Sequence, residues 1–437
     1  MSASFFHDML GSIAERGRSL LERTSGRAEA RPDDETPETL ESLSRSLLSG
    51  RGEASGVALA RRLLDRYARE PVPARIEFFH LLAREFDPDL AAIERAWERY
   101  RQDASPANLQ DLLIAVEPPR QELFRRLNLA PGGTAALVAM REDLLRHGGK
   151  EPALRKVDDD FAHLFGSWFN RGFLFLRPID WSTPADILER IIRYEAVHEI
   201  QGWDDLRRRV QPSDRRCFAF FHPSLIDEPL IFVEVALTRE IPGSIQGLLA
   251  EEREPLAASE ATTAVFYSIS NCQPGLRGVS FGNFLIKQVV EELSRELPSL
   301  TTFVTLSPVP GFAAWLSKSG NAAPLEPDWH LDAGAAERSR AELLPLAAAY
   351  FLAAKGPGGK PVDPVARFHL GNGARLERLN WLGDTSPKGL REAHGLMVNY
   401  LYDLRFIEAN HEAFANEGTV VASDAVRHHL PAPETVA

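Results

Sequence analysis

The chain has 437 residues, of which 44% are hydrophobic and 26% are charged, so it is long enough to fold as two or three domains. Its formal net charge is -12 and no dense run of Lys and Arg stands out, which argues against nucleic-acid binding. Cys217 and Cys272 lie outside any zinc-ligand or disulfide-framework spacing and the longest apolar runs are too short to span a bilayer, so we expect no metal site and no membrane partner.

Residues 1–38 are predicted to form an N-terminal segment and a flexible linker. Residues 1–21 have apolar side chains at helical spacing and several Arg, as in a transit peptide, but Asp8 and Glu15 interrupt them and such peptides are poor in acids. Residues 26–38 are polar and contain proline, which is typical of a mobile linker. Together with two cysteines outside any disulfide framework, these features favour a cytoplasmic location.

Residues 39–175 predict an all-helical domain with short connections, because apolar side chains recur every three or four positions. Amphipathic helices of this kind pack against one another first, and they can also bury a face against another subunit. We therefore expect packing and subunit contacts here rather than catalysis. Three of the stripes are Leu40, Leu43, Leu47 and Leu48; Leu59, Leu63, Leu64 and Tyr67; and Ile76, Phe79, Leu82 and Phe86.

Residues 176–437 predict a mixed domain of strands and helices, so the fold class expected for the whole chain is α+β. Short runs rich in β-branched and aromatic residues are typical of strands, and leucines and valines four apart are typical of a helix. A strand, a glycine loop, a helix and a second strand form an α/β unit on a mixed sheet. The predicted elements are strands at 217–222, 230–237, 263–270 and 301–306, the first two antiparallel, and a helix at 285–297.

A glycine-rich loop at residues 270–283 joins the third strand to the helix. Its glycines let backbone N–H groups approach a ligand closely, at the helix end where a pyrophosphate is favoured. The G-x-G-x-x-G spacing of a dinucleotide fingerprint is absent. A purely structural turn is the alternative. The loop is more similar to the coenzyme A loop of the N-acetyltransferase (GNAT) superfamily, through Gln273, Gly275, Arg277, Gly278 and Gly282.

Two further segments carry candidate catalytic groups. Ser307 ends a predicted strand and precedes Pro308, Pro310 and Gly311, so it lies on a rigid exposed turn. His369 lies between apolar neighbours, just before a Gly-Asn-Gly turn. Taken singly, Ser307 is as well explained as a cap or turn residue, and His369 as a core or capping group.

These three segments, in this order and separation, resemble the malonyl-CoA decarboxylase family, and the likeness is dense from Trp181 to Leu404. The resemblance implies a GNAT-like catalytic domain and a helical domain that makes homo-oligomer contacts, in a dimer or tetramer. It implies malonyl-CoA as substrate and acetyl-CoA as product. Ser307, in Leu-Ser-Pro-x-Pro-Gly-Phe, and His369, in Phe-His-Leu-x-Asn-Gly-Ala, occupy the positions of the family's catalytic pair.

The resemblance also implies a set of contacts with the substrate and its coenzyme. One position departs from the family: some relatives carry a glutamate in the loop where this chain has Ser280, so that carboxylate is absent here or replaced, with Glu228 and Glu234 as candidates. The implied binding residues are Arg277, Gly278, Val279, Ser280, Phe281, Gly282, Asn283 and Tyr402.

The implied reaction needs no organic cofactor. Loss of CO2 from malonyl-CoA leaves electron density that the thioester carbonyl accepts as an enolate, so the substrate supplies its own electron sink. Backbone N–H groups around Gly278 are one source of stabilisation for the enolate oxygen. We expect Ser307 to hydrogen-bond the malonyl carboxylate and His369 to protonate the enolate carbon, while the reverse assignment stays open.

Two other interpretations remain. A GNAT-type acyl-CoA transferase would use the same loop and would also need a cleft for an amine acceptor. A non-catalytic scaffold that binds acyl-CoA is favoured slightly by Ser280 and disfavoured by the presence of both Ser307 and His369. Release of CO2 without an acceptor distinguishes the decarboxylase from the transferase, and coenzyme binding without turnover would favour the scaffold.

Overall fold

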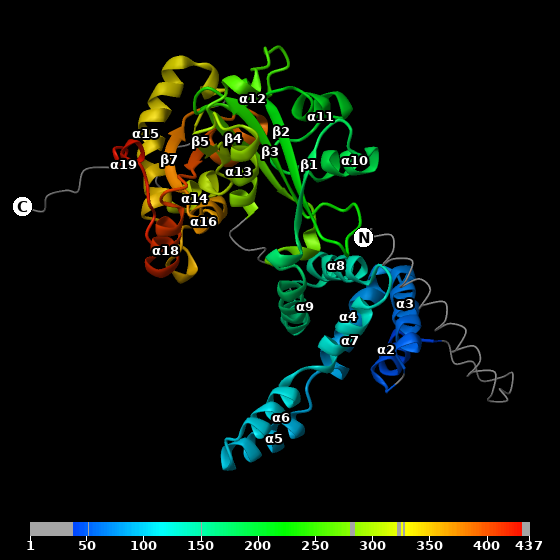
Figure 1. Ribbon diagram of the computed structural model, residues 1–437. Helices are drawn as coiled ribbons and strands as arrows, with labels where there is room; N and C mark the ends of the chain where they lie inside the picture. Colours follow the sequence, from blue (N-terminus) through cyan, green and yellow to red (C-terminus); the bar gives the residue numbers. More distant parts are fainter. Residues whose placement is uncertain are drawn as a thin grey trace, which may run out of the picture. The chain divides into compact units, whose positions relative to one another are not determined.

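Figure 1 shows the computed structural model of the chain, coloured from blue at the N-terminus to red at the C-terminus. The structure describes residues 38–50, 52–149, 151–279, 285–320, 325–326 and 328–430. Residues 1–37 of the predicted N-terminal segment, and Ser280, Phe281, Gly282 and Asn283 of the predicted coenzyme loop, lie outside these ranges. The chain divides into two compact units, and each is described by itself.

The first unit is helical and comprises the chain through Leu174 together with Phe221–Glu228 and Gln273–Phe281. Side-chain caps begin several of its helices: Thr39, Asp89 and Ser105 each accept a hydrogen bond from a backbone N–H of the first turn. Its described helices are α2 (Leu40–Leu48), α3 (Glu53–Arg69), α4 (Val72–Glu85), α5 (Leu90–Gln102), α6 (Pro106–Val116), α7 (Pro119–Asn128), α8 (Gly133–Asp143) and α9 (Arg155–Trp168), with short turns η1 (Leu144–Gly148), η2 (Pro152–Leu154), η3 (Arg171–Phe173) and η5 (Pro274–Leu276).

The predicted apolar stripes face the interior of this unit. One face of each of α2, α3 and α4 is buried, which confirms the helical periodicity. The buried stripe residues are Leu43, Leu47, Leu59, Leu63, Leu64, Tyr67, Phe79, Leu82 and Phe86.

The antiparallel neighbours α5 and α6, seen side by side in Figure 1, are the exception, because they leave apolar side chains in solvent. Ala96 is the one buried residue of α5, and α6 has none. Leu113 is 54% exposed and Ile114 is 63% exposed. We call this surface the α5–α6 apolar face; its exposed residues are Leu90, Trp97, Leu109, Leu113, Ile114 and Val116.

The second unit, formed by Phe175–Phe220, Pro229–Cys272 and the chain from Gly282 onward, is built on a mixed sheet. The strand order is β1-β2-β3-β4-β5-β8-β6, and β7 pairs with β8. β4 and β5 are parallel, whereas the β2–β3, β3–β4, β5–β8, β6–β8 and β7–β8 pairs are antiparallel. The strands are β1 (Phe175–Ile179), β2 (Arg215–Phe221), β3 (Ile231–Thr238), β4 (Thr263–Asn271), β5 (Thr302–Thr305), β6 (Ser307–Pro308), β7 (Arg375–Asn380) and β8 (Met397–Leu401).

Helices connect and cover these strands, and α13 carries the chain from the end of β4 back to the start of the parallel β5. No helix in the described ranges is long and apolar enough to cross a membrane. The helices are α10 (Ala185–Tyr194), α11 (Trp203–Val210), α12 (Ile245–Leu249), α13 (Leu285–Glu296), α14 (Phe312–Ser319), α15 (Ala333–Leu352), α16 (Pro364–Gly371), α17 (Pro387–Ala393), α18 (Ile407–Glu417) and α19 (Asp424–Arg427), with turns η4 (Ala258–Glu260), η6 (Trp329–Leu331) and η7 (Pro357–Gly359).

The predicted strands at 217–222, 230–237 and 263–270 correspond to β2, β3 and β4, and the predicted helix corresponds to α13. Their side chains are almost all buried, which explains why the sequence shows continuous apolar runs rather than alternation. A helical region followed by a mixed sheet confirms the predicted α+β class.

The strand β8 leaves β5 and continues beside β6, and this divergence positions the candidate site. Val304 of β5 pairs with Leu401, whereas Ser307 of β6 pairs with Val398. Side chains bridge the interval between the two pairings. Asn399 donates to the Thr305 carbonyl at 2.7 Å, and the Tyr400 N–H donates to Thr305 Oγ1 at 3.1 Å. The chain before Ser307 is therefore fixed to β8.

Candidate active site

Ser307 is the first residue of β6, and one residue, Leu306, separates it from the end of β5. Its side chain is buried, at 5% exposure of the residue. The turn that follows packs closely, because a Cβ on Gly311 would lie 2.6 Å from the hydroxyl oxygen of Tyr350. The prediction of an exposed turn at Ser307 is therefore wrong: the serine lies in a short strand and is buried, and the turn comes after it, at residues 310–311.

His369 lies in the last turn of α16 and is buried at 3% exposure. Asp363 caps this helix by accepting the Ala366 N–H at 2.7 Å, and Tyr350 donates to the same carboxylate at 3.2 Å. The Gly-Asn-Gly turn ends the helix: Gly373 has a φ of +84°, and a Cβ there would meet the Ile407 carbonyl oxygen at 2.1 Å. Contacts at both ends of the short helix α16, at Asp363 and at Gly373, thus fix the position of His369.

The structure brings Ser307, His369 and Tyr402 together in one hydrogen-bonded chain. Ser307 Oγ lies 3.2 Å from His369 Nε2, and His369 Nδ1 lies 2.8 Å from the Tyr402 hydroxyl. At the other end, the Ser307 hydroxyl donates to Thr305 Oγ1 at 2.9 Å. Three residues far apart in the sequence, and a fourth that the sequence did not suggest, therefore form a continuous polar array.

Burial sets the protonation states in this array. It lowers the pKa of His369 to about 3, so the free imidazole is neutral near pH 7. It raises the pKa of Tyr402 well above the usual range, so the phenol keeps its hydrogen. Because the Ser307 hydrogen points to Thr305, the contact between Ser307 Oγ and Nε2 requires the ring hydrogen on Nε2, and the Tyr402 hydroxyl then donates to Nδ1.

Aromatic side chains hold the imidazole plane. Tyr400 stacks on His369 with ring centroids 4.6 Å apart and planes 24° from parallel. Tyr402 meets the same ring edge-on, with centroids 6.1 Å apart. These contacts leave the ring little rotational freedom, as a residue that delivers a proton to a defined point requires.

The described part of the glycine loop from Gln273 onward belongs to the first unit, where Arg277 and Gly278 are exposed and Val279 is buried. Gly278 has a φ of +81°, a conformation that favours glycine. The loop starts against α8: a Cβ on Gly275 would lie 2.0 Å from the Val138 carbonyl oxygen, and Arg141 donates to the Gly275 carbonyl at 2.8 Å. A helix of the first half of the chain therefore anchors the start of the loop.

The two carboxylates considered as replacements for the family's glutamate at the position of Ser280 are Glu228 and Glu234, and they lie in different parts of the structure. Glu228 belongs to the first unit, whereas Ser307 belongs to the second. Glu234 is fully buried in β3, 3.3 Å from Arg209. Burial, and then the charge of Glu195, raise the pKa of Glu234 to about 8. The hydrogen-bond partner of Glu234 is thus Arg209 of α11.

A second buried polar cluster, which the sequence did not suggest, joins α10 to β4. The Glu195 carboxylate accepts from Ser268 at 2.7 Å and from Ser270 at 3.2 Å, and from the Val197 N–H at 2.8 Å. Ser268 and Ser270 are 73 and 75 residues away from Glu195 in the chain. The cluster satisfies a buried carboxylate and ties the segment after α10 to the sheet.

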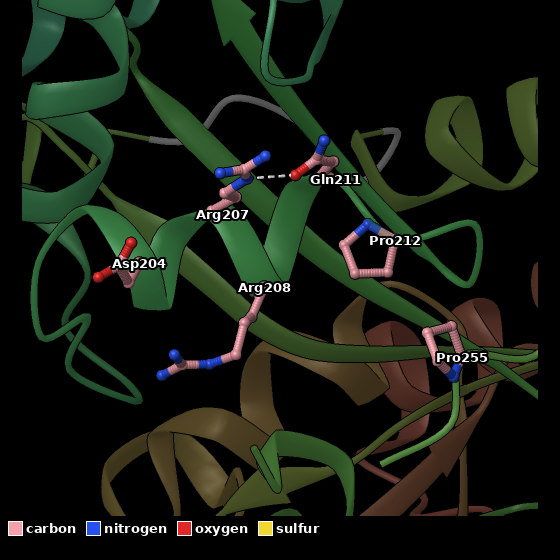
Figure 2. A pocket seen from close by; sticks show the side chains of 6 residues that line it. All are labelled: Asp204, Arg207, Arg208, Gln211, Pro212 and Pro255. Atoms are coloured by element: carbon pink, nitrogen blue, oxygen red, sulfur yellow. Dashed lines mark hydrogen bonds between the residues drawn. The ribbon is translucent and has the colours of Figure 1, made fainter. Parts of the chain in front are cut away.

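A pocket of about 520 Å³ beside α11 contains none of the predicted site residues (Figure 2). Arg207 hydrogen-bonds Gln211 and lies 5.5 Å over the Trp181 ring, and Arg208 pairs with Glu251 at 3.0 Å. Because both guanidinium groups already have partners, the pocket gives no sign of an anion site. Its lining residues are Asp204, Arg207, Arg208, Gln211, Pro212 and Pro255.

Comparison with known proteins points to one family over nearly the whole chain. Residues 86–169 match the malonyl-CoA decarboxylase N-terminal domain, and residues 172–436 match the malonyl-CoA decarboxylase C-terminal domain. The mitochondrial malonyl-CoA decarboxylase of the goose Anser anser anser is 34% identical over 464 residues, covering 95% of this chain and 90% of that protein. Its counterpart in Mus musculus is 35% identical and covers 77% of this chain and 76% of that protein.

Solved structures agree. The crystal structure of malonyl-CoA decarboxylase from Rhodopseudomonas palustris is 61% identical with a TM-score of 0.86, and it covers 90% of this chain and 100% of its own. The enzyme from Agrobacterium vitis is 59% identical with a TM-score of 0.85 and the same coverage. The chain belongs to the malonyl-CoA decarboxylase family.

Proposed function

We propose that this protein converts malonyl-CoA to acetyl-CoA and CO2, with Ser307 and His369 as its catalytic residues. The observation that carries the proposal is the hydrogen-bonded pair of Ser307 Oγ and His369 Nε2 at 3.2 Å, in a chain that belongs to the malonyl-CoA decarboxylase family. Both groups are buried, so their dipoles act in a medium where electrostatic stabilisation is stronger than in water.

The reaction breaks the bond between the α-carbon and the carboxylate of the malonyl group. The electron pair of that bond moves into the thioester, whose carbonyl oxygen takes the negative charge of the enolate, and CO2 leaves. Ser307 hydrogen-bonds the malonyl carboxylate and so places the α-carbon beside His369. The carbon takes the Nε2 proton of the neutral imidazole, which regains one from water, so one proton is consumed for each CO2 released.

Binding of the coenzyme portion falls to the glycine loop. Arg277 supplies positive charge to the phosphates, Gly278 permits close approach of the backbone, and Val279, Ser280, Phe281, Gly282 and Asn283 complete the contact. The anchoring of Gly275 against Val138 supports this assignment, because a loop that must present backbone N–H groups to a ligand needs a fixed start.

No organic cofactor enters this scheme, since the thioester is the electron sink. Exhaustive dialysis should leave the activity unchanged, and a loss restored by an added organic cofactor would refute this part of the proposal. A cytoplasmic location stays a prediction from the composition, to be checked by cell fractionation.

We also propose that two copies of the chain associate through the α5–α6 apolar face. Six exposed apolar residues on two adjacent helices mark a candidate interaction surface, and a second copy of the same helix pair would offer equally apolar side chains to cover them. Sedimentation should give a dimer or larger, with Leu113→Asp giving the monomer. A wild-type monomer at micromolar concentration would refute it.

The function is tested by mass spectrometry of malonyl-CoA incubated with purified protein and no acceptor. We expect stoichiometric acetyl-CoA and CO2. If acetyl-CoA forms only when an amine acceptor is present, the protein is an acyltransferase. If malonyl-CoA binds and remains intact, the non-catalytic scaffold is correct instead.

A further inference from the structure

Thr305 is a member of the catalytic cluster to which the proposed reaction gives no task. It is the last residue of β5 and is fully buried. Its Oγ1 accepts the Ser307 hydroxyl at 2.9 Å and the Tyr400 N–H at 3.1 Å. Thr305 therefore contacts both Ser307 and β8, the strand that ends one residue before Tyr402.

The hydrogen bonds of the cluster all have the same direction, from Tyr402 through His369 and Ser307 to Thr305. Because the Ser307 hydroxyl donates to Thr305, its oxygen accepts the Nε2 hydrogen of His369, and Nδ1 accepts the Tyr402 hydroxyl. The Ser307 hydrogen points to Thr305. A Ser307 hydrogen turned toward Nε2 would meet the hydrogen already there, or would force the ring into the Nδ1–H tautomer and break the bond from Tyr402.

Resting on the proposed function, we propose that Thr305 is a positioning residue for the decarboxylation: it holds the Ser307 hydroxyl hydrogen away from His369 in the free enzyme and donates to Ser307 when substrate is bound. A hydroxyl both donates and accepts, so this reversal needs only the rotation of two O–H bonds. The Ser307 hydrogen then turns to the malonyl carboxylate, while Oγ keeps its place 3.2 Å from Nε2.

Thr305 also has a structural contact that the test must separate from this role. Its Oγ1 is the acceptor for the Tyr400 N–H where β8 diverges from β5. Removing the hydroxyl leaves that buried N–H unpaired, which destabilises the strand junction. Thr305→Val removes the hydroxyl with little change of shape, and Thr305→Ser keeps the hydroxyl and removes the methyl group, so the two variants form a matched pair.

The first measurement is the steady-state kinetics of both variants with malonyl-CoA, beside their thermal unfolding. Loss of one hydrogen bond that orients Ser307 should lower kcat of Thr305→Val about tenfold with KM within about twofold, and Thr305→Ser should stay within about threefold of wild type. The proposal is overturned if Thr305→Val keeps the wild-type kcat, or if Thr305→Ser is as slow as Thr305→Val.

The second measurement reads the tautomer without turnover, by 15N NMR of His369. Comparison with His369→Gln identifies its signals among the 12 histidines. We expect an unprotonated Nδ1 and a protonated Nε2 in wild type and Thr305→Ser, and a shift toward Nδ1–H in Thr305→Val. A slow Thr305→Val with the wild-type tautomer would make Thr305 merely structural. If the tautomer responds as expected but wild type releases no CO2, the proposed function fails and the hydrogen arrangement stands.

Discussion

The Tyr402 hydroxyl lies 2.8 Å from Nδ1 of His369, 33 residues away in the sequence. The backbone N–H of Tyr402 donates to the Phe303 carbonyl at 2.8 Å, so the phenol is fixed by the same sheet that carries Ser307. Sequence resemblance gives Tyr402 a place near the substrate, and the structure gives it a more specific one. Its hydroxyl is the hydrogen-bond partner of the ring nitrogen that faces away from Ser307.

Tyr402→Phe should therefore reduce kcat about tenfold, because the imidazole loses the donor that fixes its tautomer. The ring stays packed, since the phenyl group keeps the edge-on contact, so thermal unfolding should change little. Steady-state kinetics and the 15N spectrum of His369 check this. Unchanged kcat with an unchanged tautomer would contradict it.

Burial of His369 makes stability depend on pH. Its pKa is about 3 in the folded protein, below the ordinary value of 6.5, so between these values the unfolded chain binds a proton that the native ring does not. The contribution of His369 to the free energy of unfolding should fall as the pH drops from 6.5 toward 3 and be constant above 6.5. Urea unfolding of wild type and His369→Gln at several pH values measures this, and equal slopes in the two proteins would contradict it.

The raised pKa of Glu234 predicts that the free energy of unfolding changes with pH in the opposite direction. Its pKa is raised from 4.5 to about 8, so between these values the native state holds a proton that the unfolded chain has lost. This contribution to stability is complete below pH 4.5 and is lost as the pH rises through 8. Glu234→Gln should flatten the decline, whereas Glu240→Gln, at an exposed position of the same unit, should not. A decline that survives in Glu234→Gln would refute the assignment.

Gly275→Ala tests the anchoring of the glycine loop. The new methyl group would lie 2.0 Å from the Val138 carbonyl oxygen, so the loop must move away from α8. We expect a loss of about 1–3 kcal/mol of stability and a KM for malonyl-CoA raised several-fold. Gly166→Ala, in α9 of the same unit with open space around it, is the control and should keep the wild-type KM. Equal KM values for the two variants would contradict the role of the loop.

The elements with continuous apolar runs could be predicted from the sequence. The runs at 217–222, 230–237 and 263–270 are strands because their side chains are buried on both faces of the sheet, and such runs are long enough to be recognised. The strands β7 and β8 gave a weaker pattern, since Arg378, Asn380 and Asn399 are polar residues that hydrogen-bond one another inside the sheet.

The site itself depends on long-range contacts that no local pattern contains. Ser307 and His369 are 62 residues apart, and their pairing was implied by family resemblance rather than by spacing. Thr305 directly precedes the Leu-Ser-Pro-x-Pro-Gly-Phe motif but looks like an ordinary strand residue. That Gly275 packs on Val138, in the first unit, follows from the tertiary fold alone.

The most direct test of the account is the rate of CO2 release from malonyl-CoA by Ser307→Ala and His369→Asn, beside wild type at equal folded concentration. Both side chains are buried and bonded to each other, so each variant should lose at least about a hundredfold in kcat while still binding the coenzyme portion. Near-normal turnover in either variant would contradict the assignment of the catalytic pair.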